Sequence, residues 1–156
     1  MLHPLNKNRS FKLLLIIGTF LCVQPLQKFS YSHRAMAHEV KVSEDVAVTF
    51  HLEPNHNPRA GEKAIIWFAL TRRGGKIIPL SECNCQLAIF REPRSPNAQP
   101  LMRPQLKAIA AEKYQDIPGT EVIFPQAGIY QLELKGSAKN PNNFKPFKTN
   151  YSVTVR

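Results

Sequence analysis

The chain has 156 residues, of which 43% are hydrophobic and 21% charged, enough for one domain with its own core and not typical of a disordered protein. Its net charge of +10 is uneven, because residues 1–37 carry five lysines or arginines and no acidic residue, which leaves +5 for the remainder. The remaining basic residues are scattered without an aromatic stripe. We therefore expect a solvated surface, with no nucleic-acid partner.

Residues 1–37 have the organisation of an export signal. A basic start leads into the apolar run 13–23, which is shorter than the roughly 20 residues that a membrane-spanning helix needs. Ala35-Met36-Ala37 then has the small-x-small pattern of a cleavage site. We expect residues 1–37 to be a signal peptide and residues 38–156 to be a domain exported to the periplasm or the extracellular space. An uncleaved leader that anchors the chain in the membrane is the alternative, because the segment before the cleavage site is long.

The first half of the exported domain has the patterns of β-strands. Apolar and polar residues alternate over 46–53, which predicts a half-buried strand with His51 on its polar side. The nearly continuous apolar run 64–70 predicts a central strand, on which Trp67 is expected to fill the core. The glycine pair in 72–76 indicates a hairpin turn. Further strands are expected over 77–80, 85–90, 119–125, 129–134 and 144–156.

Two segments have no single interpretation from the sequence. Residues 91–104 contain four prolines and are expected to form an irregular loop. Residues 106–113 are rich in alanine and are compatible with a helical turn or with a short crossing strand. About seven short strands separated by turn signals predict an antiparallel β-sandwich of immunoglobulin-like type. Tyr130 follows a glycine turn at the start of a late strand, where a tyrosine corner is expected, with its hydroxyl bonded back to the backbone.

Two motifs carry a family resemblance that covers roughly residues 46–155. Pro-Arg-Ala-Gly-Glu at 58–62 precedes the long apolar strand, and Phe-Pro-x-x-Gly-x-Tyr-x-Leu-x-Leu occupies 124–134. In this order they resemble the YtkA-like family of exported immunoglobulin-like domains and, more distantly, the CopC-like copper-resistance proteins. The resemblance implies the sandwich fold and a role in periplasmic copper handling or as an accessory module. CopC-like proteins take a second histidine from late in the fold, whereas this chain has no histidine after His56.

Cleavage after Ala37 would place His38 at the mature N-terminus. The freed α-amine and the ring of that histidine can chelate one ion, and nitrogen ligands favour Cu(II) among the common divalent metals. His51 and His56 are the other histidines of the exported domain and are the candidates for a further ligand. His51 lies on the polar side of its strand and His56 in a loop, so these positions are compatible with exposure of either side chain. The alternative is an exposed N-terminal histidine without a metal.

Cys83 and Cys85 form the second constellation. Residues two apart on a strand point to the same side, so both thiols could bind a soft ion such as Cu(I). They are also compatible with buried structural thiols or a strained mutual disulfide, with a redox pair, or with pairing to another molecule.

The sequence therefore leads to three hypotheses of different class. The first is an exported, non-catalytic binding or accessory domain of the cell envelope that binds copper through His38 with His51 or His56, and with Cys83 and Cys85 as further candidates. The second is a protein-interaction module without metal, which contacts an envelope or membrane partner through a sheet edge or the 91–104 loop. The third is a small thiol redox protein that uses Cys83 and Cys85. No motif of hydrolytic or phosphate-binding enzymes is found.

Overall fold

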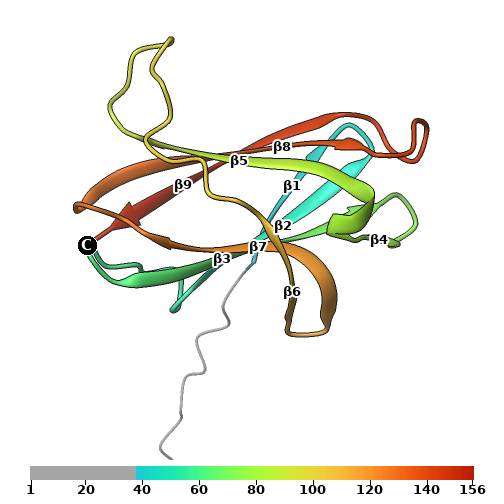
Figure 1. The fold of residues 1–156 in the computed structure, drawn as a ribbon, viewed down its shortest axis with the longest axis horizontal. Helices are drawn as coiled ribbons and strands as arrows, with labels where there is room; N and C mark the ends of the chain where they lie inside the picture. The colour runs from blue at the N-terminus through green and yellow to red at the C-terminus, as the bar shows by residue number, and fades with distance from the viewer. Residues whose placement is uncertain (1–37) are drawn as a thin grey trace, which may run out of the picture. The chain divides into compact units, whose positions relative to one another are not determined.

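Two antiparallel sheets pack face to face in residues 38–156, the part of the chain that the computed structural model describes (Figure 1). The predicted signal peptide, residues 1–37, and its cleavage site lie outside the described residues. The strands are β1 (Glu39–Ser43), β2 (Val46–Glu53), β3 (Lys63–Arg72), β4 (Ile77–Ile78), β5 (Cys83–Arg91), β6 (Lys107–Ala111), β7 (Tyr114–Ile123), β8 (Gly128–Ala138) and β9 (Phe147–Val155), with one short 3-10 helix at Leu80–Glu82.

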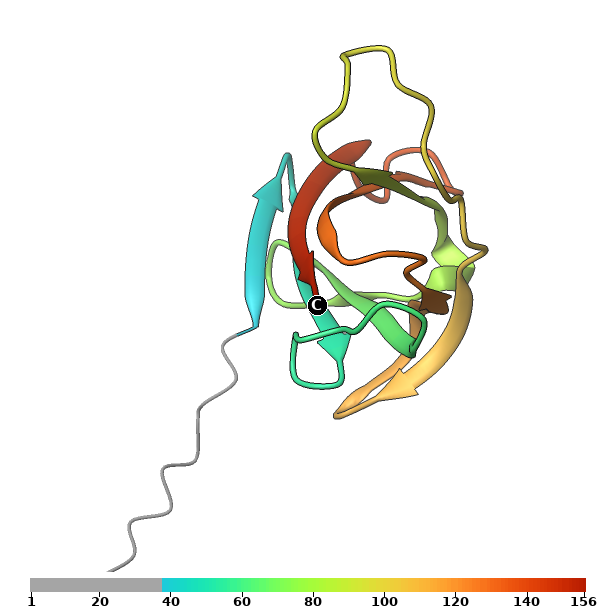
Figure 2. The same ribbon diagram turned by 90° about the vertical axis from the view of Figure 1, so that its left-hand side faces the viewer.

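The two sheets differ in size. The large sheet has the order β1-β2-β3-β7-β6, with β4 paired to β3, and the small sheet has the order β5-β8-β9. Strands β1 and β9 are edges of different sheets that lie beside each other in both views, and the Lys41 ammonium of β1 donates to the Asn150 carbonyl of β9 (Figure 2). The predicted all-β antiparallel sandwich is therefore confirmed.

Alternating side chains from both sheets form the main core. Val46, Val48, Phe50 and Leu52 of β2 are all buried in it, as the period of two predicts. From the small sheet, Tyr151 packs against Phe50 with ring centroids 4.6 Å apart. The expected tyrosine corner is also present, because the buried Tyr130 hydroxyl donates to the Gln126 carbonyl over 2.8 Å.

Several details of the sequence prediction were wrong. Nine strands are present among the described residues, where about seven were expected. Strand β1 was missed because its apolar residues, Val40 and Val42, point to solvent and give no core signal. Residues 107–111 form a strand, so the crossing strand and not the helical turn is the correct alternative for 106–113. No helix among residues 38–156 has the length and apolar character needed to cross a membrane.

A second apolar cluster covers the outer face of the large sheet. Trp67 and Ala69 of β3 pack there with Ile117 of β7, and all three are fully buried. Strand β7 changes direction along its length, so that β6 and the first half of β7 turn away from the line of β3 (Figure 1). Trp67 is therefore a core residue, as expected, but it belongs to this second cluster: its neighbours in the chain fill the main core, and Trp67 faces the opposite way.

Candidate functional site

The three histidines of residues 38–156 meet on the outer face of the large sheet. His38 immediately precedes β1, His51 lies in β2, and His56 lies in the turn after β2. The rings of His38 and His51 have centroids 4.9 Å apart, and those of His51 and His56 have centroids 4.6 Å apart. Residues separated by up to 18 positions in the sequence therefore converge because β1 pairs with β2 in antiparallel register, with Glu39 opposite Phe50.

His51 is the central member of this cluster. Its cross-strand neighbour on β3 is Trp67, and the two rings stack with centroids 4.6 Å apart and an angle of 19° between their planes. The side chain is buried, with only 6% of the residue exposed. The sequence placed His51 correctly on the face opposite the core. It left the exposure of the side chain open, since the period of a strand does not reveal whether its outer face is covered.

The backbone of the turn after β2 directs His56 back toward the sheet. His56 adopts a left-handed conformation with φ of 52°, which is uncommon for a residue with a side chain, and its amide donates to the Leu52 carbonyl over 2.8 Å. Its Nε2 atom then lies 3.3 Å from Nδ1 of His51. Local strain of this kind is often retained where it positions a side chain.

Glu112 is a fourth member that the sequence analysis missed. It occupies the turn between β6 and β7 with φ of 52°, and its Oε1 lies 3.3 Å from Nε2 of His38. The turn was hidden within the segment 106–113, whose alanine-rich composition favours no single conformation. Only the change of direction in β7 brings a carboxylate from this hairpin to histidines near the start of the domain.

The donor atoms have the spacing of a metal site. One ligating atom from each of His38, His51 and Glu112 lies within 4.8 Å of the others. With bonds of about 2.0–2.1 Å, donors at a tetrahedral angle are about 3.4 Å apart and opposite donors are at most about 4.2 Å apart. The His38–Glu112 and His51–His56 separations of 3.3 Å match the first value. The upper limit of 4.8 Å within the set of His38, His51 and Glu112 exceeds the tetrahedral value, so these side chains would have to close around a bound ion.

The cluster also favours neutral imidazoles, which are the metal-binding form. Burial lowers the pKa of His51, and the neighbouring His38 lowers it further, while Glu112 and Glu53 oppose the shift. Burial likewise lowers the pKa of His56, followed by the effects of His51 and His38. Two imidazole nitrogens 3.3 Å apart cannot both carry a proton on the facing atoms. His51 and His56 therefore share one proton in a hydrogen bond, or both bind the same metal ion.

The two cysteines lie apart from this cluster, on the other sheet. Cys83 and Cys85 are both in β5 and are joined to each other by a disulfide. Each sulfur is consumed by that bond, so in this oxidised form neither cysteine serves as a metal ligand. Among the residues proposed from the sequence, the structure thus brings together the three histidines and leaves out the cysteine pair.

The comparisons with known proteins give a fold and no family. The chain is similar to the crystal structure of a DUF4426 family protein from Pseudomonas aeruginosa PAO1, with a TM-score of 0.52 and 12% sequence identity, over 77% of this chain and 97% of that one. At this identity the likeness concerns the fold alone. No family model and no curated protein matches the chain, so the comparisons do not support the resemblance to YtkA-like or CopC-like proteins.

Proposed function

We propose that this protein is an exported β-sandwich that binds one copper ion through His38, His51, His56 and Glu112. The observation that supports it most strongly is that donor atoms of His38, His51 and Glu112 lie within 4.8 Å of one another. His56 extends this group, because its Nε2 lies 3.3 Å from Nδ1 of His51. The resemblance to exported copper-handling sandwiches, and with it a location in the cell envelope, forms part of the same proposal.

The ligand set favours copper over the harder metals. Imidazole nitrogens suit copper, zinc and nickel, whereas magnesium and calcium require mainly oxygen donors. Among divalent ions, the affinity of nitrogen-rich sites is highest for Cu²⁺. If the leader is removed after Ala37, the α-amine of His38 supplies an additional nitrogen next to the same site and strengthens this preference.

A binding role fits the arrangement better than catalysis. Three imidazoles and one carboxylate fill a four-coordinate shell, and a closed shell is typical of sites that hold a metal, whereas catalytic sites keep a position open for substrate. His51 is also buried between Trp67 and its histidine neighbours, which restricts access of a substrate to that side. We therefore assign the protein a non-catalytic role as a copper-binding or accessory module.

The experiment is a titration of Cu²⁺ into the chain that begins at His38, which contains every described strand and both apolar clusters. It is repeated with the substitution His51→Phe, which retains an aromatic ring against Trp67 but removes the ligand. We expect one equivalent to bind to the parent chain. In the variant, the dissociation constant should rise by about a hundredfold, equivalent to about 2.8 kcal/mol. Equal binding by both chains would refute the site.

A second pair of chains isolates the α-amine. The chain beginning at His38 is compared with one that retains residues 34–37, because extensions of one or two residues create new chelates between an amine and the following histidine. Tighter binding by the shorter chain assigns the amine as a ligand. Equal affinity in both, with loss of binding in His51→Phe, assigns the site to side chains alone.

The alternative function is a protein-interaction module, and one observation favours it. Strand β1 is an edge of the large sheet, and its Val40 and Val42 are 56% and 74% exposed. Because β9 lies beside the open edge of β1, these exposed side chains favour contact with an apolar surface of another chain. The substitutions Val40→Lys and Val42→Lys together should abolish capture of an envelope partner while leaving copper binding unchanged, which separates the two functions.

A further inference from the structure

We propose that the Cys83–Cys85 disulfide is an exchangeable redox centre, which accepts two electrons from a protein dithiol through attack on Cys85. This inference is independent of the copper site, since the pair lies on β5 of the small sheet, whereas the histidines lie on the outer face of the large sheet.

The disulfide contributes little to holding the fold together. It joins two residues of the same strand, and the stabilisation that a crosslink provides grows with the length of the loop it closes. The backbone ladder between β5 and β8 already fixes both positions, with Cys83 opposite Ala138 and Cys85 opposite Gly136. Reduction therefore removes one bond and leaves the pairing of the strands intact. A purely structural disulfide would be expected to connect distant segments.

The two sulfurs differ in access. Cys83 belongs to the main core and is only 2% exposed, packed near Gly136 and the ring of Phe147. Cys85 is partly exposed and lines a cleft of about 470 Å³. A thiol that approaches from solvent therefore reaches Cys85 and not Cys83.

The cleft beside Cys85 is suited to an incoming thiolate. Gln86 and Leu87 of β5 form one side, and the segment Arg103–Leu106 before β6 forms the other. Its volume lies within the range of pockets that accept a peptide side chain or a small molecule. Arg103, which carries a positive charge, is one of the residues that line this cleft, and a nearby cation stabilises the thiolate, the reactive form in disulfide exchange.

The exchange is balanced as two displacements. The thiolate of the partner forms a bond to Sγ of Cys85, the Cys83–Cys85 bond breaks, and Cys83 leaves as a thiolate that takes up a proton. The second thiolate of the partner then attacks the partner's first sulfur in the mixed disulfide. The bond to Cys85 breaks, and Cys85 also becomes a thiol. The pair has gained two electrons and two protons, the partner has become a disulfide, and the reverse sequence restores the starting state.

The test equilibrates the chain beginning at His38 in buffers with defined ratios of reduced to oxidised glutathione. Free thiols are then trapped with a maleimide and counted by mass spectrometry, while circular dichroism monitors the fold. We expect both thiols to appear together as the ratio rises, with an unchanged β-sheet spectrum, and to disappear again when oxidised glutathione is added. A disulfide that survives a large excess of dithiothreitol in native buffer, or thiols that appear only when the β-sheet spectrum is lost, would overturn the proposal.

Single substitutions identify the sulfur that is attacked. Cys83→Ser leaves the accessible Cys85, and Cys85→Ser leaves the buried Cys83. The first variant should react with an aromatic disulfide reagent at least about tenfold faster than the second. Equal or reversed rates would overturn the assignment of Cys85.

A charge substitution tests the cleft without altering either cysteine. Arg103→Gln should slow reduction of the native disulfide by glutathione by about threefold at low salt, with a smaller effect at high salt. Arg73→Gln, in the turn between β3 and β4, removes the same charge at a distant exposed position and should leave the rate unchanged. Equal rates in both variants would show that the thiolate does not enter through this cleft.

Discussion

The imidazole of His51 stacks on the indole of Trp67 across the β2–β3 pair, with ring centroids 4.6 Å apart. Trp67 is fully buried, and it is the single tryptophan of the chain. The stacking therefore places an intrinsic fluorophore in direct contact with a proposed copper ligand.

Copper binding should quench this fluorescence. A paramagnetic Cu²⁺ ion bound to His51 lies within a few ångströms of the indole, so we expect most of the emission to be lost at one equivalent of Cu²⁺ and little to be lost with Zn²⁺. Iodide serves as the control, because a fully buried indole is shielded from a soluble quencher. Emission that declines gradually over many equivalents of copper would indicate weak surface binding and contradict the proposed site.

Stability without metal should fall as the solution is acidified through the histidine range. The pKa values of His51 and His56 are lowered from 6.5 in the folded state, so the unfolded state binds more protons just below that pH. Stability is therefore full above about pH 6.5 and is lost as the pH falls through the folded pKa values. Urea unfolding at several pH values between about 5 and 8 measures this. The double substitution His51→Phe with His56→Asn, in which asparagine tolerates the left-handed turn, should flatten the profile.

Copper affinity, like the stability of the metal-free protein, should fall as the pH is lowered. Protons compete with the metal for the imidazole nitrogens, so the dissociation constant should rise as the pH falls below neutrality. Glu112→Gln provides a matched comparison, because it keeps the size of the side chain but removes the charge beside His38. We expect this variant to bind copper about tenfold more weakly at pH 7, as measured by competition with a chelator. An affinity that does not change with pH would contradict ligation by histidine.

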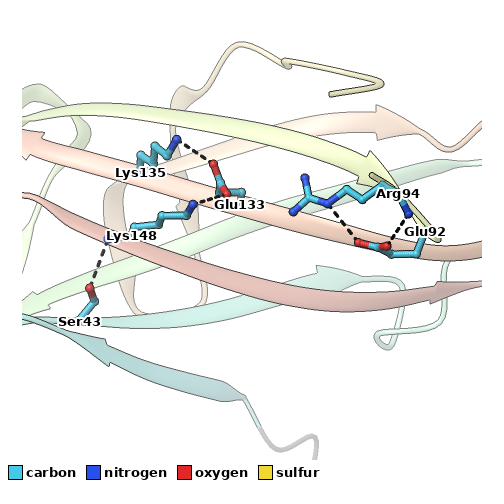
Figure 3. A network of polar contacts seen from close by, with 6 residues as sticks. All are labelled: Ser43, Glu92, Arg94, Glu133, Lys135 and Lys148. Atoms are coloured by element: carbon cyan, nitrogen blue, oxygen red, sulfur yellow. Dashed lines mark hydrogen bonds and ion pairs between the residues drawn. The ribbon is translucent and has the colours of Figure 1, made fainter. Parts of the chain in front are cut away.

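The outer face of the small sheet holds a charged group that should stabilise the fold at neutral pH. Lys135 of β8 and Lys148 of β9 are directly opposite each other, and the Glu133 carboxylate accepts hydrogen bonds from both, over 2.9 and 2.6 Å (Figure 3). Burial raises the pKa of Glu133, but the two lysines outweigh that effect, and the pKa lies below its ordinary value. The contribution is therefore present above about pH 4.5 and is lost as the pH falls through the folded pKa.

Glu133→Gln tests this arrangement. Because both lysine side chains are about half exposed, the expected loss of unfolding free energy at pH 7 is only about 1 kcal/mol, and it should vanish near pH 3. Glu121→Gln is the control, since its ion pair with Lys63 is far more exposed and should contribute a few tenths of a kcal/mol at most. Equal losses in both variants would contradict the role of Glu133.

The tyrosine corner should be a stabilising element in its own right. Tyr130→Phe removes the hydroxyl that donates to the Gln126 carbonyl and leaves the ring in the core against Phe124. We expect a loss of about 1 kcal/mol in urea unfolding, the ordinary value for one buried hydrogen bond. Tyr114→Phe, on the partly exposed outer cluster, should change stability by less than half of that. No difference between the two variants would show that the corner bond is dispensable.

The sequence determined the features that depend on local patterns. The alternation in 46–53, the apolar run 64–70, the glycine hairpin and the position of Tyr130 each report on one strand or one turn, and together they predict an antiparallel sandwich. They also identify the face of β2 on which His51 lies, because the period of a strand is fixed by its backbone geometry.

The tertiary structure decided what covers that face. The change of direction in β7 brings Glu112 to His38, the outer cluster buries Trp67, and the left-handed turn directs His56 onto His51. None of these contacts has a period or a local signal, because each depends on segments that are distant in the chain or on a single backbone angle. The sequence therefore identifies the histidines of the site, whereas only the folded chain brings them close together in space.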